Sequence, residues 1–161
     1  MLQGIKSYAG KYLHRNSIFW WILLWAQVAG LFVAYKAGIL STIWKEDVTR
    51  LTLVILLVHT ITTVKVGVDT ANLNKTWLDP LWLAADQVFA IGILGTLCGF
   101  IILMHEAFLN GIPSDAAAIQ KMLATMSSGM ATAFWVSACA IVSSIIQKIQ
   151  VMNLEMACGK E

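Results

Sequence analysis

Charged residues are scarce in this sequence. They make up 12% of its 161 residues, whereas a soluble globular domain usually carries about 25%. So few charges cannot cover a surface in contact with water, which excludes a soluble enzyme and a secreted disulfide scaffold. The formal net charge of +2 is also too small for a surface that binds nucleic acid, so we expect no nucleic-acid partner.

Residues that carry chemistry are equally sparse. The three cysteines are too few for a disulfide framework, and neither Cys98 nor Cys139 has a histidine at metal-ligand spacing. A membrane enzyme needs clustered His, Asp, Glu or Cys at the membrane boundary, and the three histidines are widely separated in the sequence. We therefore expect no enzymatic activity, no metal site and no bound cofactor.

Apolar residues make up 58% of the chain and gather in four long runs, at about 18–40, 48–68, 84–106 and 120–147. At about 1.5 Å per residue, the first run gives roughly 34 Å of helix, enough to cross a ~30 Å hydrocarbon core. Its basic leader is compatible with a signal peptide, but the run is too long and aromatic, and no cleavage site follows. The sequence predicts an all-α, multi-pass membrane bundle that forms one domain over residues 1–161.

The second run is the weakest of the four. It turns polar after Val58 and contains Lys65, so a helix lying along the membrane surface, and hence three spans, is the alternative. Each arrangement places seven of the eleven basic residues in the cytoplasm, and both put the C-terminus there. The N-terminal cluster of three bases favours four spans. We expect the fourth helix to begin near Pro113, with Ser114 as its N-cap.

Small residues recur at helical spacing in the third and fourth runs. Gly92, Gly95 and Gly99 share one helix face, and Thr96 borders it. The fourth run carries a second stripe that includes hydroxyls, formed by Gly129, Ala133, Ser137, Ala140 and Ser144. Such stripes let two helix backbones approach closely in lipid. The spacing alone indicates close packing and does not establish a pore.

The exact residue order in the two stripes is more specific for a protein family than their spacing is. The stretch Gly92–Phe100, GILGTLCGF, resembles the G-[LI]-[LI]-G-T-V-x-G-[LFI] motif of the MotA/TolQ/ExbB proton-channel family. The stretch Gly129–Ala138, GMATAFWVSA, is similar to that family's second motif, G-[IM]-[AG]-x-A-L-x-x-T-x. The resemblance covers about the second half of the chain, in the right order.

This resemblance implies a function and a set of partners. Channel subunits of that family form a pentamer in the bacterial inner membrane around two copies of a single-span partner of the MotB/TolR/ExbD kind. The partner's helix bears an essential aspartate, and H⁺ or Na⁺ flow powers mechanical work. The large cytoplasmic domain of many members is missing here. By resemblance, Thr96 is the motif threonine, Ser137 stands where threonine is usual, and Thr132 stands where some members carry glutamate.

The absence of charge fits that arrangement. No Asp, Glu, Lys, Arg or His lies between Gln87 and Met104 or between Met122 and Gln147. Hydroxyls do not titrate near neutrality and can only orient water or coordinate a cation, so another chain must supply the titrating carboxylate. The choice between H⁺ and Na⁺ stays open. A structural or holin-like membrane bundle without ion-coupled work is the alternative function.

Two ionisable residues beside these runs are secondary candidates. His59 would lie near the centre of the second span, where a histidine is a functional candidate by default. Packing or a polar helix contact is the simpler role, because the sequence supplies no certain partner. Asp86 can attract cations to a channel mouth, or it can simply compensate the dipole at a helix N-terminus.

Overall fold

The computed structural model describes residues 2–47, 49–108 and 115–159; the side chains at 2–16, 106–107, 128–129 and 132 lie outside this description. These ranges contain five helices: α1 (Leu2–Lys36), α2 (Ile39–Glu46), α3 (Leu51–Asn72), α4 (Leu78–Phe108) and α5 (Ala116–Cys158). The prediction of an all-helical chain is confirmed for these ranges.

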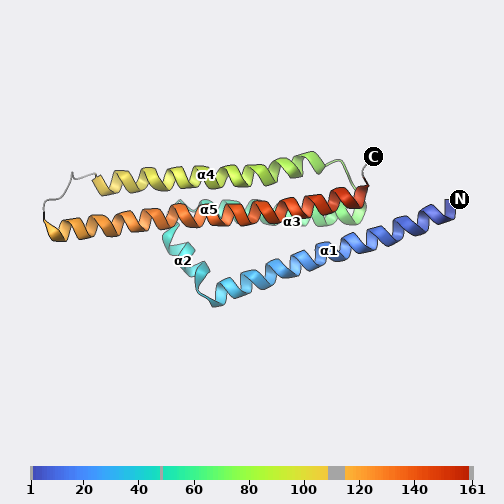
Figure 1. Ribbon diagram of the computed structural model, residues 1–161, viewed down its shortest axis with the longest axis horizontal. Coiled ribbons are helices and arrows are strands. Elements are labelled where there is room, and N and C mark those ends of the chain that lie inside the picture. The colour runs from blue at the N-terminus through green and yellow to red at the C-terminus, as the bar shows by residue number, and fades with distance from the viewer. Residues whose placement is uncertain (1, 48, 109–114, 160–161) are drawn as a thin grey trace.

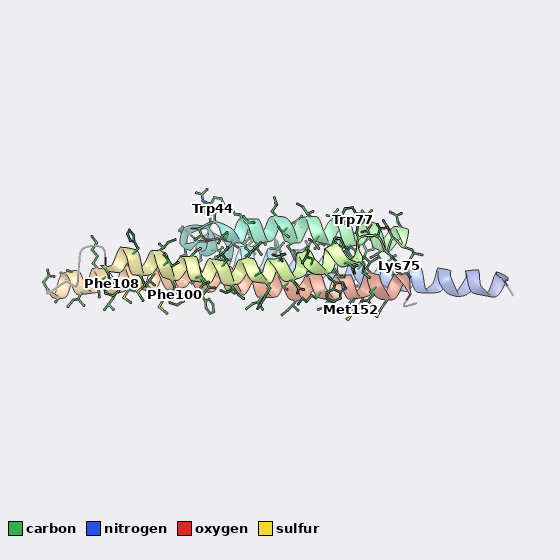
Figure 2. The ribbon with its side chains drawn as sticks, turned by 90° about the horizontal axis from the view of Figure 1, so that it is seen from above. Trp44, Lys75, Trp77, Phe100, Phe108 and Met152 are labelled. Carbon is green, nitrogen blue, oxygen red and sulfur yellow. The ribbon has the colours of Figure 1, made fainter. Side chains whose placement is uncertain are left out.

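Helices α4 and α5 form a long antiparallel hairpin, and α3 lies beside one half of it (Figure 1). Figure 2 shows that the other half of the hairpin extends beyond α3. Helix α1 diverges from the bundle, and the short α2 links it to α3. Both ends of the chain lie at the end of the molecule where α3 connects to α4.

Four helices contain a stretch long and apolar enough to cross a membrane: Ser17–Lys36, Leu51–Asn72, Leu78–His105 and Ala133–Cys158. Their number agrees with the four predicted runs, and the composition is that of a multi-pass membrane protein. The first stretch ends earlier than the predicted residue 40. The chain turns there at Gly38, whose φ of 74° lies in the left-handed region that ends a helix.

The last apolar stretch continues past the predicted end of the fourth run at Gln147. The prediction stopped there because Lys148 follows, but that charge is paired with Asp86 and the helix goes on to Cys158. The start of this helix also differs from the prediction. Its N-cap is Asp115, whose carboxylate Oδ1 accepts a hydrogen bond from the Ala118 N–H at 2.7 Å. Ser114, the predicted cap, lies outside the described residues.

The contact between α4 and α5 is built from the predicted small residues. Gly92 faces Ala140, Gly95 faces the side chain of Val136, and a Cβ built on Gly99 would lie 3.0 Å from the Cβ of Ala133. Small side chains here let the two backbones come together, which in lipid is the main source of helix attraction. Gly129 lies on α5 among the residues whose side-chain surroundings are not described.

Apolar side chains bring α3 onto this hairpin in two clusters. Ile55 of α3 packs with Val88, Val136 and Ala140, and nearer the chain ends Val66 packs with a second group formed by Leu81, Val151 and Leu154. The side chain of Trp20 on α1 reaches that second group and occupies the space that a Cβ on Gly67 would need. Most other large apolar side chains of α1 between Ile18 and Tyr35 are exposed.

Replacing Gly92 with alanine tests the hairpin contact. The new methyl group would collide with the Cβ of Ala140, which is fixed to the backbone and cannot rotate away. We expect a loss of roughly 1–3 kcal/mol in unfolding free energy, measured in detergent by circular dichroism. Adding Ala140→Gly should restore much of the loss.

Gly30→Ala is the matched control, because a Cβ there meets nothing within 4 Å. It should leave the stability unchanged or slightly raised. Equal losses at Gly92 and Gly30 would contradict the close α4–α5 contact.

Candidate functional site

Two hydroxyls meet across the α4–α5 hairpin. The side chains of Thr96 and Ser137 are in hydrogen-bond contact, and both are half-buried. Each hydroxyl is also within reach of its own helix backbone: Thr96 Oγ1 lies 3.0 Å from the Gly92 carbonyl oxygen, and Ser137 Oγ lies 2.9 Å from that of Ala133. The structure therefore brings together the two residues that the sequence motifs singled out separately.

The two hydroxyls of this pair have only two hydrogens for the three hydrogen-bond contacts that they make. Two O–H groups serve three possible hydrogen bonds, so when one hydroxyl donates to the other it gives up its own backbone carbonyl. The pair thus has two arrangements, which differ in the direction of the Thr96–Ser137 bond. In both of them oxygen lone pairs are left over, and these can accept from water or coordinate a cation.

The hydroxyl pair lies on the side of the hairpin away from α3. At about 100° per residue, Thr96 is about 140° around α4 from Ile91, which packs toward Ile55 of α3. Figure 2 shows Phe100 of α4 and Met152 of α5 on that same side. We call this surface the open face. By the same angular spacing, exposed apolar residues of this face include three on α4 within about 60° of Thr96 and four on α5 within about 80° of Ser137: Phe89, Ile93, Phe100, Phe134, Ile141, Ile145 and Met152.

An ion pair also lies on the open face. Lys148 Nζ of α5 is 2.8 Å from Asp86 Oδ1 of α4, and the two side chains are 44% and 61% exposed. Both residues lie well inside the candidate spans Leu78–His105 and Ala133–Cys158. Asp86 is two turns into α4, so it is not the acid at a helix N-terminus that the sequence suggested. A charged side chain costs about 2.5–3.5 kcal/mol at the centre of a membrane helix and less toward its ends, so these two charges favour a polar environment for this face.

His59 has a partner that sequence inspection missed. Its ring nitrogen Nε2 lies 3.0 Å from Oε1 of Gln27 on α1, and this contact ties α1 to α3. Which of the two groups donates depends on the histidine tautomer and the amide orientation. Gln27 stands in an otherwise apolar run, and a lone amide in such a run was the signal that could have identified it.

Two further residues of α5 bear on the site. Trp135 donates its indole N–H to Oε2 of Glu46 at 2.9 Å, so it faces α2 rather than lipid. Thr132, the third predicted pathway residue, lies on α5, and its side chain is outside the described set. Within the described part of the chain, no group of three His, Cys, Asp or Glu residues is placed to hold a metal ion.

Comparison with known proteins gives no match: no family model fits this sequence, and no curated protein or solved structure is similar to it. Function must therefore be inferred from the motifs and the geometry of the open face.

The contact between His59 and Gln27 can be measured by a double-mutant cycle with His59→Leu and Gln27→Leu. Hydrogen bonds between membrane helices contribute about 0.6 kcal/mol on average and up to about 1.7. We expect a coupling energy in this range for unfolding in detergent. Strictly additive losses would show that the two side chains do not interact.

Proposed function

We propose that this chain is the wall subunit of an ion channel that drives work in a larger membrane complex, and that its open face lines the ion path. The observation that carries the proposal is the composition of that face. It holds a half-buried hydroxyl pair, Thr96 and Ser137, and an exposed ion pair, Asp86 and Lys148, within helical stretches apolar enough to cross a membrane.

Lipid is a poor surrounding for such a face. The exposed ion pair would lose much of its hydration in a hydrocarbon layer, whereas a water-filled interior between subunits would keep it. The large apolar residues on the same face would then contact neighbouring subunits or a central helix. A ring of copies, each turning this face inward, satisfies both requirements.

The hydroxyl pair suits a transient ion site. Its two arrangements each contain one hydrogen bond between the hydroxyls and one to a backbone carbonyl. A passing ion or water can therefore switch one arrangement to the other without breaking the helix packing. Neither hydroxyl can hold a proton as an acid, and the described stretch from Gln87 to Met104 contains no Asp, Glu, Lys, Arg or His. The titrating group would come from a partner helix at the centre of the ring.

The resemblance of both motifs to the MotA/TolQ/ExbB family gives this proposal its stoichiometry: five copies around two copies of a single-span partner with an aspartate early in its helix. The family also places such a ring in the bacterial inner membrane, with H⁺ or Na⁺ as the moving ion. No cofactor is needed, because the energy comes from the ion gradient, about 2.3 kcal/mol per charge for each 100 mV.

The test combines composition and ion flux. The tagged chain is purified from its native membrane in mild detergent and weighed by native mass spectrometry. We expect five copies of the 17.7 kDa chain together with a single-span protein. The complex is then placed in liposomes, and dyes report H⁺ and Na⁺ entry under an imposed potential. Thr96→Val should lower the flux about tenfold or more, because a hydrogen bond to a charged group contributes roughly 1.5–3 kcal/mol.

Thr96→Ser keeps the hydroxyl and should retain most of the flux. Thr60→Val is the matched control, since Thr60 on α3 is exposed and bonds only to the Leu56 carbonyl. Full flux in Thr96→Val, or a monomeric chain, would contradict the proposal. Leakage of large solutes by the chain alone would favour the holin-like alternative.

A further inference from the structure

A second polar region lies inside the subunit, where α3 packs against α5. It is formed by Thr63, Asp69 and Thr70 of α3 and by Gln147, Gln150 and Asn153 of α5, and we call it the polar seam. Each of these residues is at most 4% exposed. Amides and a carboxylate buried inside a membrane bundle are costly unless every polar atom finds a partner.

Some of the required partners are present within the chain. The Thr63 hydroxyl donates to Oε1 of Gln150 at 3.1 Å, and the Thr70 hydroxyl donates to the Val66 carbonyl at 2.7 Å. Lys65 Nζ lies 3.0 Å from Asp69 Oδ1, so the carboxylate is paired on one side. These contacts fix the seam's side chains in place.

Other buried atoms of the seam have no hydrogen-bond partner among the described residues. They are both amide atoms of Gln147, Nε2 of Gln150 and Oδ2 of Asp69. Two of the four are N–H donors and two are acceptors. Exchanging the amide atoms of Gln147 leaves this balance unchanged, because both of its atoms are unpaired.

This mixture of donors and acceptors identifies the ligand. A bare cation would satisfy only the two oxygens and would be repelled by the amide N–H groups. An anion would be repelled by Asp69. Water donates and accepts equally well, and buried waters in proteins typically occupy sites that offer two to four such partners.

The seam extends from one end of the bundle to its interior. Asp69 stands one turn before the end of α3 at Asn72, near the end of the molecule where both termini lie. Gln147 stands eleven residues before the end of α5 at Cys158, or about 17 Å along the helix, roughly half of a ~30 Å hydrocarbon core. It lies midway around α5 between Ser144, which donates to the Ala85 carbonyl of α4, and Gln150, which contacts α3.

We propose that the polar seam is a water-filled compartment within each subunit. It opens at the Lys65–Asp69 pair on the side of the membrane that carries the termini, and it ends at Gln147, where α3, α4 and α5 meet. Oδ2 of Asp69 and the amides of Gln150 and Gln147 bind successive waters along it. The compartment is separate from the open face, so it does not depend on the proposed ring.

Cysteine accessibility tests this proposal. In a variant with Cys98, Cys139 and Cys158 replaced by alanine, Gln150→Cys is exposed in sealed vesicles to Ag⁺ or a small, charged methanethiosulfonate from either side. Val64→Cys is the control at the same height, because Val64 adjoins Thr63 on α3 but is 57% exposed, beside the apolar groove between α3 and α1. We expect Gln150→Cys to react at least tenfold faster than Val64→Cys, and only from the side of the termini.

Wild-type protein gives an independent measurement that requires no substitution. In water-edited solid-state NMR of the lipid-embedded chain, the side-chain amides of Gln147 and Gln150 should gain magnetisation from water much faster than Ile55, which is fully buried in an apolar cluster. Transfer as slow as at Ile55, no reaction at Gln150→Cys, or reaction from the opposite side would each overturn the proposal. Ion flux through the complex does not bear on this proposal, because the compartment lies within one subunit and is separate from the ion path.

Discussion

The close approach of the α4 and α5 backbones is the constraint on which the rest of the structure depends. Gly92, Gly95 and Gly99 leave room for Ala140, Val136 and Ala133, and a methyl group at any of the three glycines would meet a side chain of α5 or part of its backbone. This contact sets the register of the hairpin. The register then brings Thr96 level with Ser137 and Asp86 level with Lys148, so the polar features of the open face follow from packing.

The same register divides the polar groups of the chain between two surfaces. Toward α3, buried amides and hydroxyls form the polar seam; away from α3, the hydroxyl pair and the ion pair form the open face. The small number of charges thus describes only part of the chemistry, because uncharged amides and hydroxyls carry most of the polarity inside the spans.

Sequence patterns predicted the local features well. The four apolar helices and the two small stripes are visible because neighbouring residues repeat at helical spacing. Contacts between residues far apart in the sequence could not be predicted. No local pattern at Asp86 indicates Lys148 as its partner, and none at His59 indicates Gln27. The predicted fourth run ended at Gln147 because Lys148 follows, but Lys148 pairs with Asp86 and the helix continues to Cys158. The polar seam was missed because Gln147 and Gln150 lie on α5 whereas Asp69 lies on α3, and these two helices pack together only in the fold.

The central claim is that the open face lies against water inside an assembly and not against lipid. A nitroxide at Ile141, on that face, measures this directly by its collisions with a water-soluble nickel reagent and with oxygen, which partitions into lipid. The account predicts that nickel collisions dominate at Ile141, while oxygen dominates at the exposed Val64 of α3, beside the apolar groove between α3 and α1. Oxygen-dominated relaxation at both positions would place the open face in lipid and contradict the account.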